Sequence, residues 1–380
     1  MKPIQMADLI GQYQKIKDEI QLEIGKVLDT ASFINGPIVK EFQAHLEDYL
    51  SVKHVIPCAN GTDALQVIMM AYAFKPGSEV IVPSFTYVAT VEVIALLGLK
   101  PVFVEVYPDT FNMNIEDMES KITDKTVAIV PVHLYGQCAD MERLMNIAKD
   151  RNLKVFEDTA QAIGADYTFS DGSVVKAGTI GDAGSTSFFP SKNLGAYGDG
   201  GAITTNDDEL AAKLRMIVNH GQSERYYHDS IGVNSRLDSI QAAILKIKLK
   251  YLYDYNLARQ QVADKYNRVF AASDEIITPV TADFTSHVYH QYTIKLKDAS
   301  KRNELNKYLA AQGIPSMIYY PVPNHLQKAY SYYGYKEGDF PITEDLCSRV
   351  ISFPIHTEME ADQQDFIIEN ILKFFEKSLG

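Results

Sequence analysis

The 380-residue sequence contains only three cysteines, and their wide spacing argues against a disulfide framework. Cys58, Cys138 and Cys347 are far apart along the chain, and no CxxC pair is present that could hold a zinc ion. We therefore expect three buried, reduced thiols and no metal site.

The chain also lacks an excess of basic residues and a long apolar run. Its 36 lysines and arginines are outnumbered by 49 acidic residues, for a formal net charge of −13. Nucleic-acid binders and binders of anionic membranes need a basic face, so both classes are disfavoured. The N-terminal stretch MKPIQMADLIGQYQKIKDEI has no apolar segment typical of a secretory signal. The most apolar stretch, VEVIALLGLKPVFVEV, is broken by charges, glycine and proline, so we expect a cytoplasmic protein without a membrane span.

Short β-rich runs alternate with helical patterns up to about residue 205. The runs HVIPCA, EVIVPS, KPVFVEV, TVAIVPVHL and KVFEDT are largely apolar, and helices are expected between them. This alternation predicts an α/β fold whose mostly parallel sheet is covered on both faces. A long helical region over residues 237–270, either straight or bent, is followed by a second α/β pattern, and together they predict a smaller C-terminal domain. We place the large domain, with its N-terminal helix, at residues 1–250 and the small domain at residues 251–380.

Two of the expected strands end in residues that could meet a ligand, because ligands bind at the carboxyl ends of strands in open α/β sheets. In CANGTDAL, Gly61 and Thr62 open a helix whose free N–H groups can hold a phosphate, and the alternative for Thr62 is a plain helix cap. In VFEDTAQAIGA, Asp158 follows buried strand residues, where a carboxylate is costly without a cation. The alternative for Asp158 is also a helix cap.

A third feature is Lys192 in SFFPSKNLGAYGDGGAITTND, between an aromatic-proline run and a glycine-rich loop. Ser187 precedes it by five positions, so a hydroxyl and an amine can reach one cavity if the strand ends near Phe189. The glycines would let the backbone pass close to a ligand. Because lysines in loops are usually solvated, the alternative for Lys192 is an ordinary surface position.

The three features together fit the chemistry of pyridoxal 5′-phosphate (PLP), which needs a lysine, an acid beside its ring nitrogen and a phosphate cup. Desolvation in a pocket lowers the pKa of an amine and so frees it to attack an aldehyde. Lys192 follows Asp158 by 34 positions, a separation that allows a helix and a strand to place them on opposite sides of a ring. Tyr87, in PSFTYVAT, either stacks on that ring or is a core aromatic.

These motifs, together with HGQSERYYHDSIGVNSRLDSIQAAIL, resemble the DegT/StrS family of PLP-dependent nucleotide-sugar aminotransferases over nearly the whole chain. The resemblance implies an aspartate-aminotransferase-like fold, PLP transferase fold type I, and a homodimer with active sites at the subunit interface. It implies that Lys192 bonds covalently to PLP, that Asp158 pairs with the ring nitrogen and that Gln161 contacts the phenolic oxygen. The remaining cofactor contacts that it implies are Gly61, Thr62 and Ser187 at the phosphate, Tyr87 on the ring and Asn234 from the neighbouring subunit.

Within the family, CANGTDALQ, LYGQCAD and GVNSRLD are most similar to 3-aminotransferases of UDP-2-acetamido-2-deoxy-3-oxo-glucuronate. That likeness implies a ping-pong cycle in which L-glutamate leaves as 2-oxoglutarate and a nucleotide-linked keto-sugar accepts the amino group. The amino sugar would serve a cell-surface polysaccharide such as lipopolysaccharide. Where that pattern has His-Tyr-Pro, this chain has Tyr319-Tyr320-Pro321, and a phenol does not titrate near neutral pH as an imidazole does. The candidate substrate contacts are Arg236, Tyr319, Tyr320 and His325.

Several alternatives stay open at this point. Arg236 either contacts an anionic substrate group or forms an ion pair with Asp238 or Glu224. The substrate is alternatively a dTDP-linked 3-oxo-6-deoxyhexose or a 4-keto sugar. A sugar 3-dehydratase is disfavoured, because relatives of that kind carry histidine where this chain has Lys192. A different class of function is a non-catalytic sensor or regulator that keeps the fold.

Overall fold

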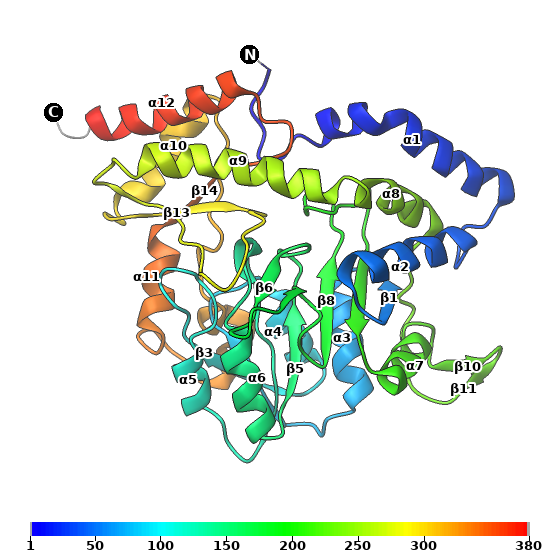
Figure 1. The fold of residues 1–380 in the computed structure, drawn as a ribbon. Helices are drawn as coiled ribbons and strands as arrows, with labels where there is room; N and C mark the ends of the chain where they lie inside the picture. Colours follow the sequence, from blue (N-terminus) through cyan, green and yellow to red (C-terminus); the bar gives the residue numbers. More distant parts are fainter. Residues whose placement is uncertain (1, 378–380) are drawn as a thin grey trace.

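The computed structural model describes residues 2–377, and its centre is a seven-stranded sheet with the order β1-β9-β8-β5-β4-β2-β3 (Figure 1). Six strands run in one direction and β9 runs against them. The prediction of a large, mostly parallel sheet is therefore confirmed. The bounds are β1 His54–Cys58, β2 Glu79–Pro83, β3 Lys100–Val104, β4 Thr126–Ile129, β5 Lys154–Asp158, β8 Ala183–Ser187 and β9 Gly201–Thr205.

Helices cover both faces of this sheet, which is why its strands are apolar at consecutive positions rather than at alternate ones. One face packs against α3, α4 and α7, and α3 and α4 lie behind the sheet in Figure 1. The other face packs against α2 and α8 at one end and α5 and α6 at the other. The bounds are α2 Pro37–Leu50, α3 Gly61–Tyr72, α4 Ala89–Leu96, α5 Ile115–Ser120, α6 Met141–Asp150, α7 Asp208–Ile217 and α8 Ser239–Leu249.

A second core lies around a three-stranded antiparallel sheet, β12-β13-β14, at the top of Figure 1. The N-terminal segment joins this core through Ile4, and α1 then runs along α8. Among residues 2–377, no helix combines the length and the apolarity needed to cross a bilayer. The bounds are α1 Leu9–Thr30, α9 Leu252–Phe270, β12 Ile276–Ile277, β13 Tyr292–Leu296, α10 Lys301–Ala311, α11 Pro341–Arg349, β14 Val350–Phe353 and α12 Ala361–Lys377. Two short hairpins complete the fold, β6 Asp166–Thr168 with β7 Val174–Lys176, and β10 Gln222–Glu224 with β11 Tyr227–His228.

The helical region expected over residues 237–270, straight or bent, is present and divides into two helices. The chain leaves α8 at Lys250 and enters α9 after Tyr251. Leu252, at the start of α9, packs with the large sheet, whereas Val262 and Phe270 pack with the small one. Because α9 contributes to both cores, the division of the chain at residue 250 stays a prediction.

Two adjacent carboxylates end β5, and they have different environments because side chains alternate along a strand. The Glu157 carboxylate is fully buried. It accepts hydrogen bonds from the N–H groups of Gly178, Ile180 and Gly181 at 2.7–2.9 Å, and it lies 2.9 Å from Nε2 of His133. Glu157 thus anchors the turn before β8 to the sheet. The carboxylate of Asp158 lies instead at the edge of the sheet formed by the carboxyl ends of the strands.

Replacing Glu157 with glutamine should lower the free energy of unfolding by about 2–3 kcal/mol, because an amide NH₂ would face backbone donors that now bind an anion. Urea denaturation of the Glu157→Gln protein measures this loss. The matched control is Glu119→Gln on the exposed face of α5, for which we expect the free energy of unfolding to change by less than about 0.5 kcal/mol. Equal stabilities of the two variants would show that the buried network does not stabilise the fold.

Candidate active site

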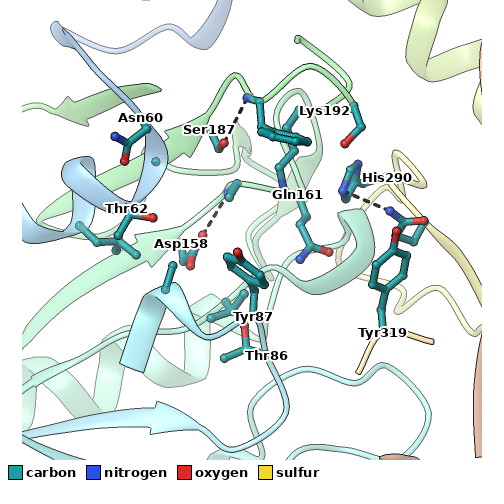
Figure 2. Close-up of a pocket in the computed structure, with 18 of the residues that line it drawn as sticks. Asn60, Thr62, Thr86, Tyr87, Asp158, Gln161, Ser187, Lys192, His290 and Tyr319 are labelled. Carbon is teal, nitrogen blue, oxygen red and sulfur yellow. Dashed lines mark hydrogen bonds between the residues drawn. The ribbon is translucent and has the colours of Figure 1, made fainter. Parts of the chain in front are cut away.

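A cavity of about 660 Å³ opens where β2, β5 and β8 end. In Figure 2, Asn60 and Thr62 lie on one side of it, His290 and Tyr319 on the other, and Lys192, Gln161 and Tyr87 between them. Nine of the twelve predicted site residues line it: Gly61, Thr62, Tyr87, Asp158, Gln161, Ser187, Lys192, Tyr319 and Tyr320. This is the edge of an α/β sheet at which ligands usually bind.

Lys192 reaches the cavity from the loop between β8 and β9 and is half-buried. Its N–H donates to the carbonyl of Phe189 at 2.8 Å, which closes the turn after the strand. Burial lowers the pKa of the Lys192 amine to about 8, and the Asp158 carboxylate acts in the opposite direction. The amine is therefore partly unprotonated near neutral pH, as a nucleophile must be.

The glycines of this loop lie close to other backbone atoms of the protein. This finding corrects the expectation that they let the backbone pass close to a ligand. A Cβ on Gly195 would lie 2.3 Å from the carbonyl oxygen of Pro190, and one on Gly201 would lie 2.4 Å from the carbonyl carbon of Asn60. Real Cβ atoms do not come so close, so both positions require glycine. The glycines hold the loop of Lys192 against β8 and the start of α3.

Asp158 ends β5 and is not a helix cap, since a turn rather than a helix follows it. Its backbone N–H donates to the carbonyl of Pro131 at 2.9 Å, and its carbonyl accepts from His133 at 3.0 Å. Its carboxylate is buried and accepts from the hydroxyl of Thr90 at 2.8 Å and from the N–H of Ala160 at 3.1 Å. A carboxylate has about four acceptor positions, so the group can still bind a cation or an N–H in the cavity.

The start of α3 offers an anion site beside Lys192 and Ser187. Asn60 caps this helix by accepting from the N–H of Asp63 at 2.8 Å, so Asn60 and not Thr62 is the cap. No hydrogen bond within residues 2–377 uses the N–H groups of Gly61 and Thr62, and both residues line the cavity. Free N–H groups at the start of a helix attract phosphate. A Cβ on Gly61 would lie 2.7 Å from Cβ of Ser187, so only glycine lets the two sides of this cup meet.

Gln161 and the two tyrosines form the opposite wall of the cavity. The amide oxygen of Gln161 accepts from the N–H of Tyr135 at 2.9 Å, and its Nε2 donates to the hydroxyl of Tyr320 at 3.2 Å. Burial raises the pKa of the Tyr320 phenol, which therefore stays protonated at physiological pH. The ring of Tyr87 lies 6.1 Å from that of Tyr320 and is 56% exposed, so Tyr87 is not a core aromatic.

Three predicted residues lie outside the cavity. Arg236 lines a second cavity of about 280 Å³ and donates to the amide oxygen of Asn219 at 3.3 Å, and none of the ion pairs among residues 2–377 includes it. Asn234 is exposed, and its contact with a second subunit stays a prediction. His325 is buried against Phe340, with Nε2 3.0 Å from Oε1 of Glu344, and this placement argues against a direct contact with the sugar.

Three further residues, Thr90, His290 and Gln291, belong to the site or contact it, and the sequence did not predict them. Thr90 belongs to the quoted motif PSFTYVAT, but its partner Asp158 is 68 positions away. His290 and Gln291 line the cavity just before β13 of the small sheet, and no local pattern links them to it. Burial and the nearby Lys192 hold the pKa of His290 well below its usual value, so this imidazole is neutral.

The comparison with protein families identifies the chain. Residues 14–372 match the model of the DegT/DnrJ/EryC1/StrS aminotransferase family. The chain belongs to this family. The predictions of the family, of its fold and of an aminotransferase enzyme are therefore confirmed.

Relatives with different described activities are similar to the chain over almost its whole length. A "pleiotropic regulatory protein" of Geobacillus stearothermophilus is 46% identical over 98% of each chain. The UDP-2-acetamido-2-deoxy-3-oxo-D-glucuronate aminotransferase of Pseudomonas aeruginosa is 43% identical over 94% of this chain and 96% of the relative. The dTDP-3-amino-3,6-dideoxy-alpha-D-galactopyranose transaminase of Aneurinibacillus thermoaerophilus is 44% identical over 96% of each.

Solved structures agree with the fold. An aminotransferase of the same family from Brucella abortus is 43% identical and superposes with a TM-score of 0.92 over 98% of this chain and 99% of that one. The Bacillus subtilis protein NtdA, solved with bound cofactor PMP, is 31% identical, with a TM-score of 0.84 over 94% of this chain and 82% of that one.

In the cofactor-free protein, Lys192 should react with an amine-labelling reagent with a midpoint near pH 8, because burial favours the uncharged amine. Below that pH the amine is protonated and unreactive. The Asp158→Asn variant should shift the midpoint to lower pH, since the carboxylate now stabilises the ammonium form. Peptide mass spectrometry after labelling across a pH series measures both midpoints, with exposed Lys213 as the internal control. A midpoint near 10.5 for Lys192 would show that the amine is solvated.

Proposed function

We propose that the protein is a PLP-dependent aminotransferase that moves an amino group from L-glutamate to a nucleotide-linked keto-sugar. The observation that carries this proposal is the shared cavity of Lys192, Asp158 and the start of α3. An amine, a carboxylate and a phosphate cup around one space are what PLP requires. The match to an aminotransferase family and the PMP bound in a similar structure support the same cofactor.

The residues present fit this cofactor. The free N–H groups of Gly61 and Thr62, with the hydroxyl of Ser187, would hold its phosphate, and Asp158 would pair with its ring nitrogen. The need for glycine at position 61 is explained if the cup must admit a phosphate beside Ser187. When bound, PLP supplies a ring that withdraws electrons and so stabilises the charge left when a proton leaves the amino acid.

Two side chains then perform the chemistry that the protein contributes. Lys192 would carry a proton at Nζ, taking it from Cα of the amino acid and delivering it to the aldehyde carbon of the cofactor in the first half of the cycle, and making the reverse transfer in the second half; a pKa near 8 suits both directions. The Asp158 carboxylate favours a protonated ring nitrogen. One cavity would serve both the amino donor and the keto acceptor, so the 2-oxoglutarate formed from the donor would leave before the acceptor binds, and this order is a ping-pong cycle.

For the acceptor we propose a UDP-linked 3-oxo sugar acid, used in building a cell-surface polysaccharide. The support is the likeness to the Pseudomonas aeruginosa aminotransferase, and the alternative is a dTDP-linked keto-sugar, as the name of the Aneurinibacillus relative describes. Tyr319 and Tyr320 both line the cavity, and only Tyr319 departs from the compared pattern, which has histidine there, so Tyr319 is the residue through which specificity would differ. A regulatory role has the name of the Geobacillus relative in its favour, but a regulator has no need of a reactive lysine.

We further propose that the protein acts as a cytoplasmic homodimer. Asn234 and Arg236 lie outside the cavity of their own chain, as expected if they serve a neighbouring one. Close by, the hairpin β10–β11 and the segment after it expose large side chains, with Tyr226 in the turn at 76% and Ile231 beyond β11 at 88% exposure. Exposed apolar groups of this kind are typical of a surface that another chain covers.

Adding glutamate to the PLP-loaded protein should convert the visible absorbance of the bound cofactor to that of its amine form, with release of 2-oxoglutarate. The Lys192→Ala variant should lose this conversion by about 10³-fold, the size expected for removing a general acid–base group. Lys213→Ala, on the exposed face of α7, is the control. Conversion by Lys192→Ala at the wild-type rate would overturn the assignment. A wild-type protein that binds PLP and converts no amino donor would favour the regulator.

A panel of nucleotide-linked keto-sugars, assayed with the amine-loaded protein and read by mass spectrometry, tests the acceptor. We expect the UDP-linked 3-oxo sugar acid to gain one amino group at a kcat/KM at least about tenfold above the dTDP-linked 3-oxo-6-deoxyhexose, because a cation that pairs with the carboxylate of the sugar acid in the complete, two-chain site would be left unpaired by a neutral sugar. The reverse order would establish the dTDP-linked alternative.

A further inference from the structure

The hydroxyl of Thr90 is the one side-chain group within residues 2–377 that forms a hydrogen bond with the carboxylate of Asp158. Thr90 lies in the first turn of α4, has no exposed surface, and places Oγ1 2.8 Å from Oδ2 of Asp158. Threonine hydroxyls in helices commonly bond to a carbonyl of the preceding turn. Here the hydroxyl instead joins α4 to the end of β5.

The rest of Asp158 is already fixed by the main chain. Its N–H and carbonyl pair with Pro131 and His133, and the next residue, Thr159, donates to Ser185 on β8 at 2.8 Å. What the backbone leaves free is rotation of the carboxylate about its side-chain bonds. The N–H of Ala160 holds Oδ1 and Thr90 holds Oδ2, so the two contacts together determine which acceptor positions face the cavity.

We propose that Thr90 is a positioning residue that aims the Asp158 carboxylate at the ring nitrogen of the cofactor. This inference rests on the proposed function, because it takes Asp158 as the partner of that nitrogen. Thr90 itself does not line the cavity, whereas its neighbour Ala89 and its partner Asp158 do. Its effect is therefore transmitted through Asp158, in the way that an outer hydrogen bond orients a ligand group.

The inference is tested by binding of the amine form of the cofactor, which makes no covalent bond to Lys192. Equilibrium dialysis compares this compound with an analogue whose ring nitrogen is replaced by carbon. Thr90→Val removes the hydroxyl and keeps the shape, and should weaken binding of the natural compound by about tenfold, the ratio that one hydrogen bond to a charged group represents. Binding of the analogue should change less than about twofold, because it lacks the atom that Asp158 would meet. Thr90→Ser, which keeps the hydroxyl, should restore binding.

The control is Thr205→Val, since Thr205 is also buried and its hydroxyl donates to the carbonyl of Asp182 at 2.8 Å, away from the cavity. It should bind both compounds like the wild type. Equal weakening of both compounds by Thr90→Val, or no weakening of either, would overturn the role of Thr90 and leave the proposed function intact. Failure of the wild-type protein to bind the natural compound would overturn the proposed function, and the inference with it.

Discussion

The site depends on an amine held in a place where burial and a carboxylate act on it in opposite directions. Desolvation favours the neutral form of Lys192, and the charge of Asp158 favours the ammonium, and burial is the larger effect. A solvated lysine would remain protonated at neutral pH, and a tight ion pair with Asp158 would keep it so. The fold separates the two groups by placing them on different elements, the end of β5 and the loop after β8, around one cavity.

Much of the fold could be predicted because local patterns of apolar residues in the sequence determine it. The runs ending at Cys58, Pro83 and Asp158 are apolar at consecutive positions, and only a sheet covered on both faces buries them. The break between α8 and α9 could not be predicted in the same way. Its residues, Lys250 and Tyr251, are compatible with a helix, and the change of direction follows from packing α8 and α9 against different cores.

The candidate site was predictable to the extent that its residues lie in short motifs. Lys192, Asp158 and Gly61 stand beside glycines, adjacent carboxylates or small residues that look unusual in the sequence alone. Thr90 and His290 do not lie beside unusual neighbours of this kind, because their roles depend on partners that are distant in the sequence. The glycines of the Lys192 loop show a second limit of prediction from sequence. Their presence correctly predicted that the loop backbone approaches another group closely. It did not reveal that this group is the backbone of Pro190 and Asn60 rather than a ligand.

The charges around the cavity bear on how many chains complete the site. Among the described residues that line it, Lys192 is the only lysine or arginine, and His290 is neutral. In the proposed reaction, glutamate carries two carboxylates and a nucleotide-linked sugar carries a diphosphate, so either proposed substrate would need more positive charge than the start of α3 supplies. Arg236 and Arg215 instead line the second cavity on another part of the chain. A site shared between two subunits is expected to show this separation of the nucleophile from other cations, and it supports the proposed homodimer on electrostatic grounds.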